Sequence, residues 1–343
     1  MSSENHDPGA TYAGPQVSEG RVQGPLLLAG GCPRSGTTLL RTMLNAHPDL
    51  AVPHETKFVV HAYRRRDAFG DLRDPERRRD VARWIVGLKL GQYSRIGIPE
   101  KELAEAFAAA PPSLGSLIAV CFGLYAEREG KSRWGDKRPS YAYDLNALFQ
   151  MFPDTKFVNV VRDPRACVLS MRKAWKIYGR LASATEVWDQ TYQDVQNVME
   201  RFPILEIRYE DLLAEPEKTL LTICEFTGLD TAGVPEMMAY HKGKTPTGYL
   251  YENAGKPLDP SKTHKWASEL EPEEIAFVER LLADRMKYYG YEPVTPAGAR
   301  IDKDMMEEYS RLRSERIKER RQRQMVEFKR KFTYRQPVAV IES

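Results

Sequence analysis

The sequence lacks the cysteine and histidine patterns of a metal site or a disulfide scaffold. Its four cysteines are widely spaced, form no CxxC pair, and are not accompanied by a histidine cluster. These spacings exclude the common zinc-binding and disulfide-rich classes, so we expect no bound metal and reduced thiols. The cysteines are Cys32, Cys121, Cys167 and Cys224.

Long apolar runs are also missing. The longest apolar stretch near the start, Pro25 to Gly31, is far too short to span a bilayer. The first 24 residues are polar and do not resemble a signal peptide. We therefore expect a cytoplasmic protein without a membrane span. We also expect residues 1–24 to form a disordered leader, because they have too few large apolar groups to offset the entropy of ordering.

Charge of either sign is in little excess. The net charge is +3, with 29% charged and 42% hydrophobic residues, as in an ordinary soluble globular protein. This balance does not favour nucleic acid as a partner. We predict one domain over residues 25–295 and a charged helical extension over residues 296–343.

The basic residues are densest between Arg311 and Lys331, where they alternate with glutamates. Met325 and Phe328 are spaced three apart in this segment. The pattern favours a solvated amphipathic helix that packs across the domain or across a partner subunit. The length of this helix makes a homodimer a reasonable expectation.

Short apolar or β-branched segments alternate with helical patterns along the domain. This alternation predicts an α/β fold with a parallel sheet that helices cover on both faces. The expected strands are 26–29, 50–52, 156–161 and 205–209. The first of these is expected to stop at the two glycines that follow it. The expected helices begin at Thr37 and end before His47, and cover 166–175, 220–226, 301–331 and several segments between 67 and 130.

The segment Gly31 to Thr38 has the G-x4-G spacing of a loop that binds phosphate groups, and it lies between a strand and a helix. Glycines allow a tight turn, and the positive end of the following helix attracts an anion. Thr37 stands where nucleotide triphosphatases have lysine, so the only cation in the loop is Arg34. Such a site suits a less charged donor than Mg-ATP.

Two motifs carry a resemblance to a known family. Pro33 to Leu39 resembles the 5′-phosphosulfate loop of sulfotransferases that use 3′-phosphoadenosine-5′-phosphosulfate (PAPS). Val161 to Ala166, followed by Ser170, resembles their 3′-phosphate motif. The resemblance implies a P-loop-NTPase-like fold and an in-line transfer of a sulfuryl group from PAPS to an acceptor hydroxyl, with no required metal.

The same resemblance implies a set of residues that bind PAPS. Arg34 would also offset the charge that develops on the transferring group. Lys265 is followed by Trp266, as in the late segment of the family that closes over the nucleotide. The expected PAPS-binding residues are Arg34, Ser35, Gly36, Thr37, Thr38, Arg162, Ser170, Tyr209, Lys256 and Lys265.

Within the family, the stretches Arg41 to Pro48 and His54 to Lys57 are similar to segments of protein-tyrosine sulfotransferases. The resemblance implies that Glu55 is the general base and that Lys137 stabilises the transition state. His54 is the rival base, because other sulfotransferases use histidine. Adjacent residues of an extended strand point to opposite faces, so we expect only one of the two to reach the acceptor.

The acceptor stays open between carbohydrate, phenol, peptide tyrosine and a secondary metabolite. The sequence departs from the tyrosine enzymes at Pro164, Ala174 and Leu250, and it lacks their cysteines near Val52 and Gly135. Two other functions also stay open. One is a P-loop kinase of a small metabolite, and the other is a non-catalytic nucleotide-binding protein that interacts through its C-terminal helix.

Overall fold

A parallel sheet forms the centre of the molecule. The computed structural model describes residues 23–89, 93–174, 180–242, 257–334 and 336–341. Within this part, five strands pair in the order β2-β3-β1-β4-β5, and every pair is parallel. All carboxyl ends therefore meet at one edge. The strands are β1 (Leu27–Gly31), β2 (Leu50–Ala51), β3 (Arg133–Lys137), β4 (Lys156–Val161) and β5 (Ile204–Arg208).

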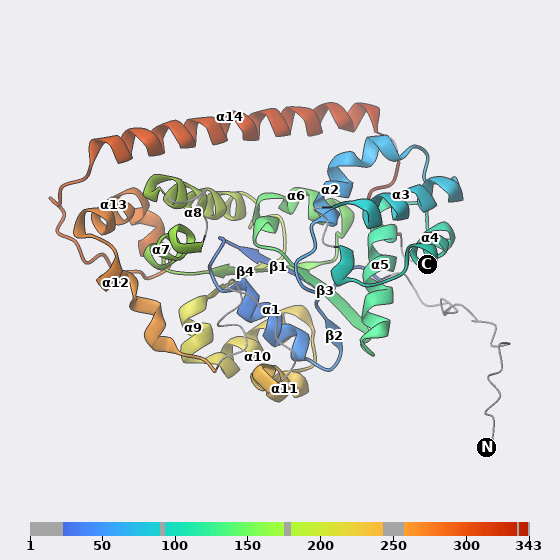
Figure 1. Ribbon diagram of the computed structural model, residues 1–343, viewed down its shortest axis with the longest axis horizontal. Coiled ribbons are helices and arrows are strands. Elements are labelled where there is room, and N and C mark those ends of the chain that lie inside the picture. The colour runs from blue at the N-terminus through green and yellow to red at the C-terminus, as the bar shows by residue number, and fades with distance from the viewer. Residues whose placement is uncertain (1–22, 90–92, 175–179, 243–256, 335, 342–343) are drawn as a thin grey trace, which may run out of the picture.

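Helices cover both faces of the sheet, with α1, α10 and α11 on one side and α6 and α8 on the other (Figure 1). The helices are α1 (Thr37–Ala46), α2 (Phe58–Arg65), α3 (Pro75–Gly87), α4 (Glu100–Ala109), α5 (Leu114–Arg128), α6 (Leu145–Met151), α7 (Pro164–Ala174), α8 (Leu181–Gln196), α9 (Tyr209–Ala214), α10 (Pro216–Thr227), α11 (Val234–Met238), α12 (Trp266–Glu269), α13 (Pro272–Tyr288) and α14 (Lys303–Thr333). Short 3-10 turns η3 (Pro139–Tyr143) and η8 (Pro260–His264) also occur.

The period of two along a strand explains the two covered faces. In β1, Leu27 and Ala29 pack into the apolar cluster of α1, α10 and α11. Leu28 points the other way, into the cluster that includes α2, α5 and α6. Because successive side chains of a strand alternate, one short apolar run supplies both cores. The predicted α/β fold with a parallel sheet between helices is confirmed.

β3 and β1 differ most from the sequence prediction, whereas the bounds of β2 and β5 differ from it by one residue. β3, between β2 and β1, was not predicted, because its buried Asp136 and Lys137 are residues that a strand core rarely contains. β1 continues to Gly31 and does not stop at the glycine pair. A Cβ on Gly31 would lie 2.4 Å from the carbonyl oxygen of Val160. Glycine therefore lets β1 approach β4 closely at this point.

Helix α14 lies across the domain, from the end near α13 and α8 to the end near α2 and α3 (Figure 1). Tyr309 donates a hydrogen bond to Asp189 of α8 at 2.7 Å. At the other end of the helix, Glu327 accepts from Arg66, just after α2, at 2.6 Å. The predicted packing across the domain is thus observed, but Met325 does not make it, because its side chain is 57% exposed.

The segment after α14 is bound to the body of the domain. Val338 and Val340 pack against the apolar cluster that contains α5 and α6. The Gly115 amide donates to the carbonyl of Val338 at 2.9 Å, and the Val340 amide donates to the carbonyl of Met151 at 2.8 Å. A Cβ on Gly115 would lie 2.5 Å from the Val340 nitrogen, so a glycine is needed for this approach. The extension is part of the folded unit.

None of the helices that the structure describes has the length and apolar character needed to cross a membrane.

The interface between α8 and α14 predicts a pH-dependent stability. Glu186 is 4% exposed and accepts from Arg316 at 3.3 Å. Burial raises its pKa to about 7 although the Arg316 charge acts in the opposite direction. A carboxyl with a raised pKa stabilises the fold fully below its ordinary pKa and loses that contribution as the pH rises through the folded value. The wild-type free energy of unfolding should fall by about 2 kcal/mol from about pH 5 to about pH 8 through this group.

Urea unfolding of the Glu186→Gln variant at both pH values measures this effect. Glutamine keeps an acceptor for Arg316 but cannot titrate, so the stability should depend less on pH. Asp194 and Asp136, whose pKa values burial raises to about 6, leave part of the slope in place. Equal slopes for wild type and variant would contradict this account.

Candidate active site

Most of the site residues predicted from the sequence follow the carboxyl ends of the strands. Arg34 to Gly36 lie in the loop after β1, and Thr37 and Thr38 begin α1. The loop after β2 contains Glu55. Lys137 ends β3, and Arg162 follows β4. Because the strands are parallel and hydrogen-bonded, these residues gather at one edge of the sheet. Ligands of open parallel sheets bind at this edge.

The loop after β1 has the backbone geometry of an anion cradle. Gly36 has φ 102° and directly precedes α1. Arg34 has φ 70°, a left-handed value that non-glycine residues seldom adopt. Ser35 is fully buried, and its hydroxyl has no hydrogen-bond partner within the described part of the chain. A strained turn and an unsatisfied buried hydroxyl at a helix start are features of a ligand site.

Side chains from α7, from α9 and from the turn after β4 surround this loop. Arg34 donates through Nε to the Ser170 hydroxyl at 3.1 Å. Arg162 donates through Nη1 to the Arg34 carbonyl at 3.0 Å. The guanidinium of Arg162 lies 4.5 Å from the centre of the Tyr209 ring. The two motifs, far apart in sequence, are therefore contiguous in space.

The late segment is only partly visible. Lys256 lies outside the residues that the structure describes. The side chain of Lys265 is exposed, at the end of η8. Trp266 is buried, and the guanidinium of Arg165 stacks 3.7 Å from its ring centre. Sequence reasoning did not single out Arg165, although it belongs to the 3′-phosphate motif. Its ion pairs with Asp163 and Glu279 indicate a structural role.

Glu55 and Lys137 form an ion pair at the β2–β3 side of the same edge. Lys137 Nζ lies 2.8 Å from Glu55 Oε1, and the side chains are 2% and 26% exposed. Burial would raise the pKa of Glu55, but the charge and hydrogen bond of Lys137, with help from Arg138 and Arg95, lower it below its ordinary value. The carboxyl is therefore ionised at neutral pH, as a general base requires.

The rival base, His54, has different surroundings. Its Nε2 lies 3.4 Å from Nη1 of Arg41. Burial and the nearby charges of Arg41 and Arg95 lower the pKa of His54 to about 4. The imidazole is therefore neutral, and it sits beside a cation that disfavours its taking up a proton. These surroundings favour Glu55.

Behind the ion pair lies a buried polar network that the sequence did not reveal. The Asp136 carboxylate is fully buried and accepts from the Thr56 hydroxyl at 2.7 Å. It also accepts from the Tyr141 hydroxyl and, at 2.9 Å, from the Lys137 amide. The neighbouring Lys137 was noticed through the family resemblance, but its partner Asp136 had no comparable signal.

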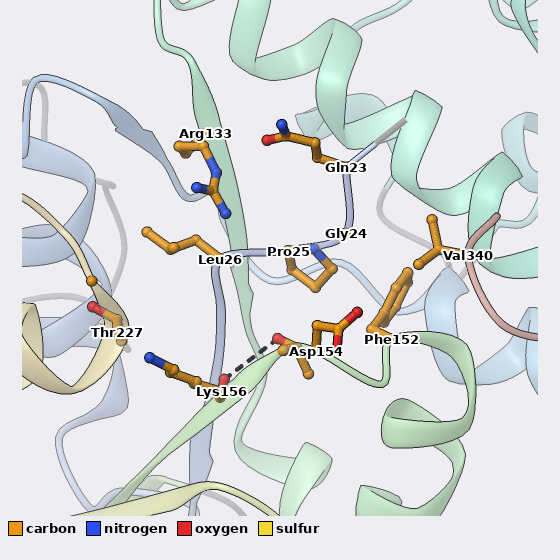
Figure 2. A pocket seen from close by; sticks show the side chains of 12 residues that line it. Gln23, Gly24, Pro25, Leu26, Arg133, Phe152, Asp154, Lys156, Thr227 and Val340 are labelled. Carbon is orange, nitrogen blue, oxygen red and sulfur yellow. Dashed lines mark hydrogen bonds between the residues drawn. The ribbon is translucent and has the colours of Figure 1, made fainter. Parts of the chain in front are cut away.

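No group of three or more His, Cys, Asp or Glu side chains suited to a metal ion occurs among the described residues. A cavity of about 380 Å³ is lined by residues such as Leu26, Arg133 and Lys156 (Figure 2). These residues lie at the amino ends of β1, β3 and β4. The cavity is therefore at the edge of the sheet opposite Glu55 and Arg34, and it does not belong to the same site.

Comparison with known proteins agrees with this arrangement. The chain is 26% identical to protein-tyrosine sulfotransferase 1 of Danio rerio over 283 residues, which cover 78% of this chain and 73% of the relative. It is 26% identical to protein-tyrosine sulfotransferase 2 of Gallus gallus over 288 residues, covering 78% and 70% of the two chains.

A solved structure supports the fold. The sulfotransferase domain from the Synechococcus PCC 7002 olefin synthase superposes with a TM-score of 0.51 at 24% identity, covering 78% of this chain and 95% of that domain. This likeness confirms the predicted P-loop-NTPase-like sheet. The model of the sulfotransferase family matches residues 25–233, more than half of the sequence. The chain therefore belongs to the sulfotransferase family of enzymes.

Proposed function

We propose that this enzyme transfers a sulfuryl group from PAPS to an acceptor hydroxyl, with Glu55 as the general base. One observation carries the proposal. The cradle around Arg34 and Arg162 lies at the same edge of the sheet as the Glu55–Lys137 pair, whose two atoms are 2.8 Å apart. The cradle offers cations and amides for the phosphate groups of a donor, and the pair offers a base for the acceptor.

The residues of the cradle fit an anionic nucleotide. Ser35 Oγ and Arg162 Nε are buried and unpartnered within the described residues, so both have donor capacity left for a bound anion. The start of α1 adds backbone N–H groups. Thr38 and Ser170 are half-buried and offer hydroxyl groups beside the loop.

The side chains of the site account for each part of the transfer. Glu55 takes the proton of the acceptor hydroxyl as the acceptor oxygen forms its bond to sulfur. The bond between sulfur and the 5′-phosphate oxygen breaks, and its electron pair leaves with adenosine 3′,5′-bisphosphate. Arg34 and Lys137 supply positive charge where negative charge develops. The products are a sulfate ester, the bisphosphate and a proton on Glu55.

Two measurements test the proposal against its alternatives. Adenosine 3′,5′-bisphosphate should raise the melting temperature of the protein, and Mg-ATP at the same concentration should not. Labelled PAPS should then transfer label to at least one member of a panel of carbohydrates, phenols and tyrosine peptides. Stabilisation by Mg-ATP alone would favour a kinase. Nucleotide binding without transfer to any acceptor would favour a non-catalytic protein.

Lys137→Met tests the role of the buried lysine. We expect kcat to fall by about 10²-fold or more, because one preorganised charge beside the reacting groups is lost. The pKa of Glu55 should rise, since burial remains while its largest opposing charge disappears. The acidic limb of the kcat–pH profile should therefore move to higher pH. A variant with unchanged kcat and an unmoved limb would contradict this role.

A further inference from the structure

The contact between Thr56 and Asp136 lies directly beside the contact between Glu55 and Lys137. Thr56 follows Glu55 in the loop after β2, and Asp136 precedes Lys137 in β3. Two hydrogen bonds between adjacent residues thus join the same two chain segments. The one from Thr56 to Asp136 is 2.7 Å long, and the one from Lys137 to Glu55 is 2.8 Å long. One is fully buried, and the other has its Glu55 side chain 26% exposed.

This pairing has a simple geometric consequence. Adjacent side chains of extended backbone point to opposite sides, as Asp136 and Lys137 do in β3. The buried hydrogen bond between Thr56 and Asp136 therefore determines how far the loop after β2 can slide or rotate relative to β3. Any shift of Thr56 away from Asp136 also moves Glu55 away from Lys137, because Glu55 and Thr56 are joined by one peptide bond.

The hydrogen bond between Thr56 and Asp136 is held by more neighbouring contacts than the ion pair between Glu55 and Lys137. Asp136 also accepts from the Tyr141 hydroxyl and from the Lys137 amide, so one carboxylate joins the loop, β3 and η3. Thr56 and Tyr141 are both fully buried, so neither hydroxyl can exchange its partner for water. A buried polar group that loses its partner is costly, and such networks hold one conformation.

Charge balance gives the network a second role. Burial lowers the pKa of Lys137, and the neighbouring carboxylates of Glu55 and Asp136 act against this and favour its charged form. Burial raises the pKa of Asp136 to about 6, while its hydrogen bonds from Tyr141 and Thr56 act against this. The network thus helps to keep the Asp136 carboxylate ionised close to a buried ammonium group.

We propose that Thr56 and Asp136 are positioning residues, which set the separation and orientation of Glu55 and Lys137 through a buried hydrogen bond one residue away from that pair. The part of this inference that concerns turnover rests on the proposed sulfotransferase function. The part that concerns the geometry of the pair does not.

The test uses three threonine variants of the full chain. Thr56→Val removes the hydroxyl at almost constant shape, and Thr56→Ser keeps it. Thr227→Val is the matched control, because it removes another buried hydroxyl, bonded to the Ile223 carbonyl at 2.7 Å, at the opposite edge of the sheet. This design avoids replacing Asp136, whose loss endangers folding.

The first readout is independent of catalysis. The pKa of Glu55, followed by carbon NMR of its carboxyl, should rise in Thr56→Val. When Lys137 lies farther from Glu55, its charge counteracts less of the increase in pKa that burial causes. It should stay near the wild-type value in Thr56→Ser and Thr227→Val. An unchanged pKa in a folded Thr56→Val protein would overturn the positioning role.

The second readout is turnover with PAPS. Thr56→Val should lower kcat about tenfold or more, with KM for PAPS changed less than about twofold. Thr56→Ser should recover most of this loss. Wild-type protein without transfer activity would refute the proposed function, and the NMR result would still decide the positioning role. Equal losses of kcat in Thr56→Val and Thr227→Val would reduce the effect to general destabilisation and so overturn the inference.

Discussion

Replacing Glu55 with Gln should lower kcat by about 10²- to 10⁴-fold, the range that positioned general bases contribute. Glutamine has the size of glutamate and can still accept from Lys137, but its amide cannot take the proton of the acceptor. The affinity for adenosine 3′,5′-bisphosphate should change little, because the nucleotide cradle is built around Arg34 and Arg162. Steady-state kinetics and calorimetry measure the two effects separately.

The neighbouring His54 supplies the control. His54→Ala should lose less than about tenfold in kcat, because the imidazole is neutral and faces Arg41. If this variant is inactive while Glu55→Gln keeps most of its turnover, the base is His54. The two residues are adjacent, so a general disturbance of the loop would affect both variants alike. A large difference between them therefore identifies the base.

The apolar part of the fold was readable from the sequence because it follows simple periods. The strand over 156–161 and the helix that begins at Thr37 and ends before His47 agree with β4 and α1. Both segments combine apolar side chains at the correct spacing with a clear end, a loop or a proline. The candidate site residues came from the resemblance to the sulfotransferase family, and not from these periods.

Strand β3, the charged part of the sheet, could not be predicted from the sequence. β3 contains Arg133, Asp136 and Lys137 in five residues, and such a segment resembles a surface loop. The charges of Asp136 and Lys137 are tolerated because each finds a partner about 80 residues away in sequence, at Thr56 and Glu55, and Asp136 finds a further partner in Tyr141 of η3. The contacts with Thr56 and Glu55 form only when the chain folds, so no local sequence pattern predicts them. The same reason hid the positioning network from sequence analysis.

Gly36→Ala should weaken the binding of adenosine 3′,5′-bisphosphate by about 30-fold or more, for two reasons. Gly36 has φ 102°, which costs an alanine about 1–3 kcal/mol. A Cβ would also lie 2.2 Å from Cδ2 of Tyr209, and so displace the ring against which Arg162 rests. The loop of the variant relaxes to relieve both effects, and regaining the binding conformation then costs at least about 2 kcal/mol, since 1.4 kcal/mol corresponds to tenfold in affinity. Calorimetric titration of the folded variant measures the loss.

Gly123→Ala is the matched control for this change. Gly123 lies within α5, with open space around the position of a Cβ. An alanine there should stabilise the helix by about 0.5–1 kcal/mol and leave nucleotide affinity as in wild type. Gly36→Ala should also lower the melting temperature, whereas Gly123→Ala should not. If Gly36→Ala bound the bisphosphate with wild-type affinity, the loop after β1 would not be the nucleotide cradle, and the placement of PAPS beside Arg34 would be wrong.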